Sequence, residues 1–317
     1  MHGFSSTPPA AEHVSYEHAT SSFQMAKQEI INKIERRGDL PYASIEKQLE
    51  LLEKLGEFAL GRFLIEKRVL DGYWTHYVVT HPLHGRITGL NHNQEPLHPL
   101  EVFLLDEAPS ALATQERFSL FKDEIKKHIH EGCSFASIPS GLMAELLDLD
   151  YSHVQSFTLH GIDLDPETLS QAQTYAEEKG LTAHSYFSEQ DAWKLDLSEE
   201  FDLIASNGLT IYEPNDDRVI ALYMQFYGAL KPGGVLITSF VTPPPAPGLT
   251  TEWDLKYVSQ QNTLLQKIIL VDLLEAKWQI FRKEETVKAQ LHRAGFKEIE
   301  ILYDKAHIFP TVIAKKK

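Results

Sequence analysis

The sequence predicts an α/β protein with a seven-stranded, mostly parallel sheet that carries helices on both faces. After Cys133, short apolar runs alternate with amphipathic stretches, and this alternation is typical of parallel sheets. Before Cys133, apolar residues recur at helical spacing instead, which predicts a separate helical region. The strand-like runs are CSFASI, SFTLHGIDL, TAHSYF, FDLIASNG, GGVLITSF, KEIEILYD and IFPTVIAKK.

The N-terminal part is expected to be a mobile arm followed by helices. Residues 1–22 are rich in Ser, Thr, Pro and Ala, which is typical of a mobile arm. Helical spacing begins at Phe23, and Gly38 is suited to end that helix. Gly56 and Gly61 interrupt the next helical run, so one straight helix is not expected there.

This pattern divides the chain into a helical cap region at 23–112 and a sheet domain at 113–317. Residues 73–109 of the cap region are rich in aromatic residues and histidine, and we expect them to form loops. Residues 243–292 begin with a proline-rich loop and continue as a helical pattern. We therefore expect a helical insertion before the last two strands, acting with the cap as a lid. The cap helices are also candidates for pairing in a homodimer.

Composition limits the partners of the protein. The 317 residues carry a formal net charge of −15 and show no basic patch, so a nucleic acid partner is not expected. Cys133 is the single cysteine, which excludes an internal disulfide framework and favours a reducing compartment. The sequence shows neither a signal-peptide pattern nor an apolar run of membrane-spanning length. We expect a cytoplasmic protein that does not enter the membrane.

The bend after the first predicted strand is a candidate ligand-binding turn. The strand meets Pro139, Ser140 and Gly141, and a helical pattern follows at once. In open parallel sheets, ligands bind where the carboxyl end of a strand meets the next helix. A glycine lets the backbone approach a ligand, and a helix N-terminus presents free N–H groups. Alone, the stretch is equally consistent with a plain strand-to-helix corner.

Polar residues also follow the next three strands. Asp163 ends the second strand, where a carboxylate can hold the two hydroxyls of a ribose. Asp165 precedes Pro166 and is instead typical of a helix N-cap. Asp191 follows the third strand and either accepts a hydrogen bond from an adenine amino group or caps a short helix; we favour the ligand. Asn207 follows the fourth strand.

Taken in order, these elements resemble the class I S-adenosylmethionine-dependent methyltransferases. That family has a glycine-rich turn, an acid after strand two, an Asp-Ala pair after strand three, a strand like FDLI and an LKPGG turn. The resemblance covers roughly residues 115–317 and implies a Rossmann-like fold, S-adenosylmethionine as cofactor and S-adenosylhomocysteine as product. The chain departs from the family at the first motif. Ser137 stands where an acid that often contacts the cofactor's amino group is usual, and Gly141 alone matches the usual glycines.

The resemblance also implies which residues form the site. The residues expected to contact the cofactor are Ser137, Pro139, Gly141, Leu142, Asp163, Leu164, Asp191, Ala192, Trp193 and Asn207. On the acceptor side, Asn207 is expected to hydrogen-bond the acceptor and Tyr212 to orient it. Arg117 either approaches the cofactor's carboxylate or forms a surface ion pair. No metal site is expected, although the cap region contains several histidines.

The expected reaction is methyl transfer to an oxygen or nitrogen of a small molecule. Two alternatives stay open: a catalytically weak or inactive scaffold or regulatory subunit, which the degenerate first motif favours, and a protein methyltransferase with the cap as docking surface. A nicotinamide-dependent dehydrogenase is disfavoured because the first turn lacks the three-glycine pattern that a pyrophosphate needs. Tyr73, Trp74, His76 and Tyr77 either line an acceptor pocket or pack the helices together, and we favour packing.

Overall fold

The computed structural model describes residues 16–246, 248 and 250–317, with side chains from residue 22 onward. It forms two compact units, each built from three segments of the chain. Unit 1 contains the chain up to Leu70, Tyr77–Leu112 and Val258–Trp278, and unit 2 contains Asp71–His76, Ala113–Tyr257 and Gln279–Lys317. Residues 1–15 of the expected arm lie outside the described residues. The functional roles of cap, lid and cofactor domain stay predictions.

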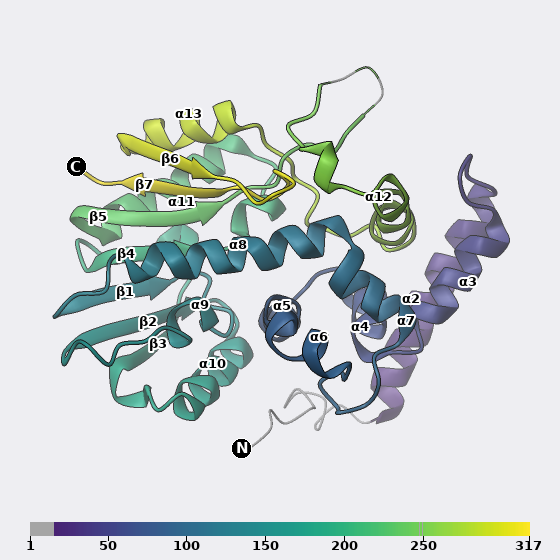
Figure 1. Cartoon of the computed structure of the whole chain (residues 1–317), viewed down its shortest axis with the longest axis horizontal. Coiled ribbons are helices and arrows are strands. Elements are labelled where there is room, and N and C mark those ends of the chain that lie inside the picture. Colours follow the sequence, from purple (N-terminus) through teal and green to yellow (C-terminus); the bar gives the residue numbers. More distant parts are fainter. Residues whose placement is uncertain (1–15, 247, 249) are drawn as a thin grey trace. The chain divides into compact units, whose positions relative to one another are not determined.

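Unit 2 is built on a seven-stranded sheet with the strand order β3-β2-β1-β4-β5-β7-β6 (Figure 1). The strands are β1 (Cys133–Ser137), β2 (Phe157–Asp163), β3 (Ser185–Glu189), β4 (Phe201–Ser206), β5 (Leu230–Ser239), β6 (Glu298–Leu302) and β7 (Thr311–Lys315). Neighbouring strands from β3 to β5 pair in parallel, whereas β7 pairs antiparallel with both β5 and β6. The predicted Rossmann-like α/β fold is therefore confirmed.

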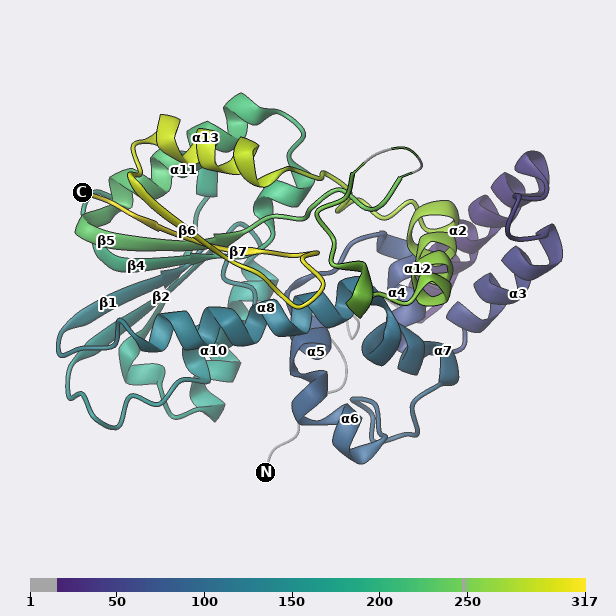
Figure 2. The ribbon, with the colours of Figure 1, turned by 45° about the horizontal axis from the view of Figure 1, so that its top comes forward.

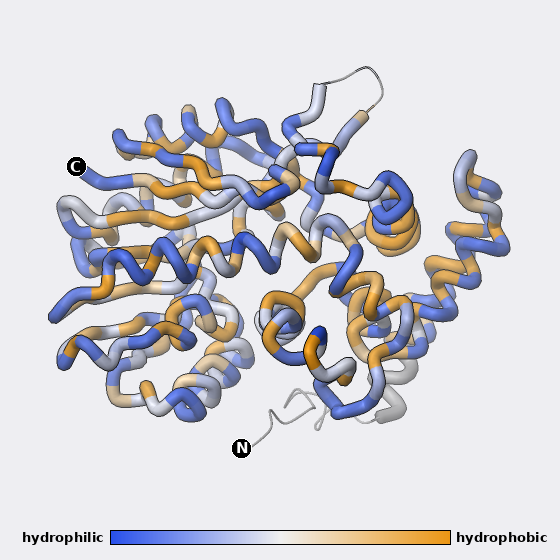
Figure 3. The backbone as a smooth tube through the Cα atoms, in the orientation of Figure 1, coloured by the Kyte–Doolittle hydropathy of each residue, from blue (hydrophilic) through white to orange (hydrophobic). Residues whose placement is uncertain are grey.

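Helices cover both faces of this sheet. They are α8 (Pro109–Lys126), α9 (Ala144–Leu147), α10 (Pro166–Glu178), α11 (Asp216–Ala229) and α13 (Glu284–Ala294). Figure 2 shows α11 and α13 on one side of the sheet and α8 and α10 on the other. Strands covered on both faces read as continuous apolar runs, and Figure 3 shows β4 and β5 largely hydrophobic between more polar helices. This explains why apolar runs alone indicated the strands.

Local signals in unit 2 mostly act as the sequence predicts. Asp165 caps α10, since its side chain accepts a hydrogen bond from the backbone N–H of Glu167 at 3.1 Å. The LKPGG stretch is not a separate turn, because β5 already begins at Leu230. Gly233 has a φ of +79°, and the β4–β5 register shifts across Phe201 and Leu203. Glycine therefore permits an irregular start of β5.

Unit 1 is helical. Its longer helices are α2 (Tyr16–Arg37), α3 (Ile45–Leu55), α4 (Ala59–Lys67) and α12 (Gln260–Gln266). The break near Gly56 agrees with the expected interruption, since α3 ends at Leu55. The helix α2 begins at Tyr16, before the position at which the sequence pattern places its start.

The expectation of loops at 73–109 is wrong. This stretch contains much of α5 (Gly72–Thr80), the short helices α6 (Gly85–Thr88) and α7 (Pro99–Val102), and the start of α8. Aromatic and β-branched residues have modest helix propensity, which misled the interpretation. One local effect and one tertiary effect outweigh this modest helix propensity. The side chain of Asp71 accepts a hydrogen bond from the N–H of Trp74 at 2.8 Å, and Tyr73 and Trp74 are buried.

Candidate functional site

The parallel strands bring their carboxyl ends to one edge of the sheet. Ser137 at the end of β1 lies in register with Ala205 in β4, and Asp163 at the end of β2 lies in register with Glu189 in β3. The connections stay tied to this edge, because the N–H of Ser140 donates to the carbonyl of Ile162 at 2.9 Å. The predicted candidate residues after β1, β2, β3 and β4 therefore share one edge.

The turn after β1 is held by the carboxylate after β2. Gly141 has a φ of +47° and Met143 a φ of +58°, both in the left-handed region. The N–H of Gly141 donates to Oδ2 of Asp163 at 3.1 Å. The helix α9 that follows spans Ala144–Leu147, one turn and shorter than the sequence suggests. Pro139 is half-buried, and Leu142 is buried.

Asp163 is a fixed, half-buried acceptor. Its Oδ1 accepts a second backbone hydrogen bond, from the N–H of Asp165 at 3.2 Å. Burial raises the pKa of Asp163, and these backbone donors partly oppose that effect. The next residue, Leu164, is exposed. The two backbone donors leave the carboxylate with free lone pairs for further donors.

The first candidate residue after β3, Asp191, caps a short helix and stays partly exposed. Asp191 caps the short helix η4 (Ala192–Lys194), because its Oδ1 accepts from the N–H of Trp193 at 3.0 Å. Its side chain remains 36% exposed, and its other oxygen, Oδ2, lies 3.9 Å from Nζ of the exposed Lys194. Ala192 is buried. The indole of Trp193 donates to the carbonyl of Arg218 at 2.9 Å, which binds it to α11.

The loop after β4 presents an orphaned acceptor. Oδ1 of Asn207 is buried and has no hydrogen-bond partner among the described residues. Downstream, Tyr212 ends the short helix η5 (Leu209–Tyr212) and is 39% exposed. The buried Arg282 donates to the carbonyls of Thr210 at 2.7 Å and Glu213 at 2.6 Å. A residue remote in sequence thus fixes the backbone that carries Tyr212.

A buried carboxyl group lies beside the position of the missing family acid. Ser137 is fully buried, and its hydroxyl donates to the carboxylate of Glu145 in α9. Glu145 is itself only 7% exposed, and burial raises its pKa. The acid absent from the end of β1 is therefore replaced in space by an acid from the next helix.

The arginine Arg117 of α8 is buried close to this carboxyl group. It is 5% exposed, and burial lowers its pKa to about 10, although Glu145 opposes the change. One guanidinium nitrogen donates to Oγ of Ser239 at 3.4 Å, and the guanidinium lies 3.8 Å from the centroid of the Phe309 ring. Its Nε has no hydrogen-bond partner in the described part of the chain. The surface ion pair considered for Arg117 is thus excluded by its burial.

The segment Asp71–His76 lies against the turn after β1. A Cβ placed on Gly72 would be 3.2 Å from the Cα of Gly141 and 2.9 Å from a methyl group of Thr168. Asp71 is half-buried there, and burial raises its pKa. Close contact of two glycines lets this segment cover the turn.

The aromatic residues that follow Gly72 pack within unit 2. Tyr73 and Trp74 are 7% and 5% exposed, and their rings meet edge to face at 5.1 Å. His76 packs similarly against Tyr175 at 4.9 Å. Burial raises the pKa of Tyr73 to about 12. These contacts agree with packing for the three residues in unit 2.

The set of site residues predicted from the sequence is incomplete. Sequence reasoning missed Glu145, Gly72 and Arg282. A signal existed only for Glu145, as an acid in the helical pattern that follows a strand end lacking its usual acid. No group of three or more His, Cys, Asp and Glu side chains in the described residues is arranged to hold a metal ion. None of the described helices has both the length and the apolar character needed to cross a membrane.

Comparisons with known proteins agree with this architecture. The family model of the methyltransferase domain matches residues 140–234, from the turn after β1 into β5. A crystal structure of a possible exported protein from Bordetella parapertussis is 40% identical, with a TM-score of 0.88, covering 96% of this chain and 98% of that chain. No curated protein matches the sequence.

Two further solved structures are more distant. Magnesium protoporphyrin IX methyltransferase from Synechocystis, with bound S-adenosylhomocysteine, is 14% identical, covers 76% of this chain and 97% of that chain, and has a TM-score of 0.49. An N-methyltransferase from Bradyrhizobium japonicum is 15% identical, covers 67% and 90%, and has a TM-score of 0.45. Neither is similar enough to bear on the substrate of this chain.

Proposed function

We propose that this chain, which belongs to the class I S-adenosylmethionine-dependent methyltransferases, transfers a methyl group to an oxygen or nitrogen atom of a small molecule. Its cofactor is S-adenosylmethionine. The observation that carries the proposal is the shared carboxyl edge, where the Gly141 turn, Asp163 and the orphaned Asn207 lie on neighbouring strands. The net charge of −15 favours a small acceptor over a nucleic acid.

The buried charges beside β1 fit the amino-acid portion of the cofactor. That portion carries one ammonium and one carboxylate group. Glu145 offers an acceptor for the ammonium, and Arg117 offers a donor that has no ion-pair partner in the described residues. We assign these two residues to the zwitterion, with Ser137 positioning Glu145. This pair would replace the acid that the family usually has at the end of the first strand.

The remaining candidates fit the adenosine portion. Asp163 retains lone pairs for two ribose hydroxyls, and its backbone hydrogen bonds hold it in place. Oδ2 of Asp191, which is outside the cap and lies 3.9 Å from Nζ of Lys194, can accept from the adenine amino group. Ala192 and Leu164 would flank the ring. The role of Trp193 is then indirect, since its contact with Arg218 holds this loop against α11.

The acceptor would bind beyond β4. When bound, the cofactor supplies an already activated methyl group on a sulfonium centre, so the protein has mainly to align the acceptor and exclude water. Oδ1 of Asn207 can accept a hydrogen bond from an O–H or N–H of the acceptor. Tyr212 would orient it, on a loop held by Arg282. A dedicated base is not required for a neutral amine.

Isothermal titration with S-adenosylmethionine, S-adenosylhomocysteine and 5′-methylthioadenosine tests the cofactor site. We expect micromolar binding of S-adenosylhomocysteine, lost in Asp163→Ala and kept in the exposed control Asp196→Ala. Glu145→Gln should weaken S-adenosylhomocysteine roughly tenfold but leave 5′-methylthioadenosine unchanged, because the latter lacks the amino-acid portion. No binding by the folded wild type would reject the enzyme and favour the scaffold alternative.

A screen of small alcohols and amines with a labelled methyl donor tests the acceptor class. Transfer to a protein substrate instead of any small molecule would favour the protein methyltransferase. We also propose a cytoplasmic location, based on the single cysteine and the reducing compartment it favours. Fractionation of cells tests this, and light scattering tests the homodimer expected from the cap helices.

A further inference from the structure

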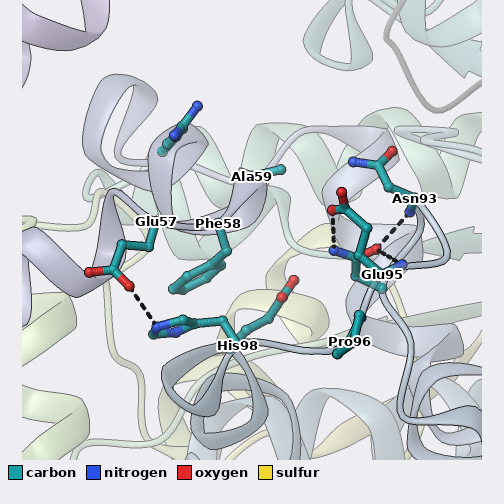
Figure 4. Close-up of a pocket in the computed structure, with 10 residues that line it drawn as sticks. Glu57, Phe58, Ala59, Asn93, Glu95, Pro96 and His98 are labelled. Atoms are coloured by element: carbon teal, nitrogen blue, oxygen red, sulfur yellow. Dashed lines mark hydrogen bonds and ion pairs between the residues drawn. The ribbon is translucent and has the colours of Figure 1, made fainter.

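A polar pocket lies within unit 1, outside the elements that form the proposed cofactor site (Figure 4). It has a volume of about 380 Å³, which suits a small organic molecule. Three carboxyl groups line it, from Glu57, Glu95 and Glu101. Phe58 and His98 form another part of the wall, with their rings stacked at 5.2 Å and 16° between planes.

The deepest of these carboxyl groups has an unused oxygen. Glu101 is only 1% exposed. Its Oε1 accepts a hydrogen bond from the hydroxyl of Tyr77 at 3.0 Å, whereas its buried Oε2 has no partner among the described residues. Burial raises the pKa of Glu101. An orphaned buried acceptor of this kind is costly, so a donor that enters the pocket would be stabilised.

The surroundings of Glu101 add negative charge. Nδ1 of His98 accepts from the N–H of Leu100 at 3.1 Å, so its Nε2 carries the proton and donates to Glu57 at 3.1 Å. Both ring nitrogens of His98 are thereby used in hydrogen bonds. Arg62 also lines the pocket; its Nε donates to the backbone carbonyl of Gly56 at 2.7 Å, and its charge offsets one of the three carboxyl groups. The pocket wall therefore carries three carboxyl groups against one cation.

The carboxyl groups are not arranged as a metal site. Across the described residues, no group of three or more His, Cys, Asp and Glu side chains is placed to hold one ion. An organic ammonium suits separated acceptors better, because its N–H groups point in different directions and its carbon chain can lie on the Phe58–His98 stack. We propose that this pocket binds a small aliphatic amine as its ammonium ion, with Oε2 of Glu101 as the main acceptor.

Titration of the full-length protein with putrescine tests this proposal, with 1,4-butanediol as the uncharged control of similar length. We expect putrescine to bind and the diol not to bind. Glu101→Gln keeps the shape and an acceptor for Tyr77 but removes the charge-assisted hydrogen bond, so affinity should fall roughly tenfold or more. Glu46→Gln, on the exposed surface of α3 in the same unit, should bind like the wild type.

Proton release gives a second readout. Since burial raises the pKa of Glu101, an ammonium partner should favour its ionised form and expel protons. Repeating the titration at mildly acidic pH in buffers of different ionisation enthalpy measures this. If Glu101→Gln does not fold by circular dichroism, the comparison of putrescine with the diol and the proton release of the wild type carry the test. No putrescine binding, equal binding of the diol, or unchanged affinity in folded Glu101→Gln would overturn the proposal.

Discussion

Replacing Arg117 by methionine should make the protein more stable while impairing its cofactor site. The pKa of Arg117 is lowered from 12.5 to about 10 by burial, which corresponds to about 3 kcal/mol against the charged form. Arg117 is a base whose pKa is lower in the folded state than in the unfolded state. The loss of folding stability is therefore fully present below the folded-state pKa of about 10, and it disappears only above 12.5, where Arg117 is neutral in both states. At pH 7 the folded protein therefore carries the whole penalty.

Methionine removes this penalty and keeps much of the volume. The variant loses the contact with the Phe309 ring, worth about 1 kcal/mol, and a weak hydrogen bond to Ser239, worth about 1 kcal/mol. The expected net gain in the free energy of unfolding is about 1 kcal/mol, in line with buried charges replaced by apolar residues of similar size. Urea denaturation without ligand measures it, and Lys126→Met on the exposed face of α8 is the control.

The same variant should bind S-adenosylhomocysteine at least about tenfold more weakly, with 5′-methylthioadenosine unaffected. The two results together separate a ligand-binding arginine from a structural one. A loss of stability greater than about 1 kcal/mol would show that the buried cation already has adequate partners, which refutes the reasoning from its orphaned Nε. Equal weakening of both ligands would mean that Arg117 acts on the shape of the site and not on the carboxylate.

Three further predictions follow from close contacts and buried groups. Gly72→Ala should destabilise the protein by about 1–3 kcal/mol in thermal denaturation, because its Cβ would lie 2.9 Å from a Thr168 methyl group. Gly228→Ala, with open space around it, should not do so. Because burial raises the pKa of Asp163, its contribution to the free energy of unfolding is greatest below pH 3.8 and declines as pH rises. Affinity for S-adenosylhomocysteine should instead fall on acidification, because the ribose hydroxyls need the carboxylate as acceptor. Denaturation and ligand titration across this pH range show whether both trends occur. Arg282→Lys should lower turnover more than cofactor affinity, and unchanged kcat would contradict its role in holding the loop after β4.

The sheet was predictable because its signals are local. Apolar runs covered on both faces identify strands such as β1 and β4 without any tertiary knowledge. Asp165 beside Pro166 likewise identifies a helix start from two adjacent residues. The helix α5 was missed because its formation depends on burial of Tyr73 and Trp74, which propensity does not register.

The site was predictable only where topology decides it. Parallel strands necessarily bring Gly141 and Asp163 to one edge, so their hydrogen bond follows from the strand order. Gly72 and Arg282 approach from segments far away in sequence, and no local pattern indicates such contacts. Glu145 is an intermediate case for prediction. Ser137 stands where the family usually has an acid, and the carboxyl group of Glu145 lies beside it.

The discontinuous make-up of unit 1 bears on how the chain folds during its synthesis. The carbonyl of Arg68 accepts from the N–H of Lys277 at 3.0 Å, and Lys33 pairs with Glu275 at 2.6 Å. The first helices to leave the ribosome contact one another, but they lack this part of their packing until residues 258–278 emerge, after the strands β1 to β5 have been made. During that interval their apolar faces are open to chaperones and proteases, and the N-terminal helices become protected only late in translation.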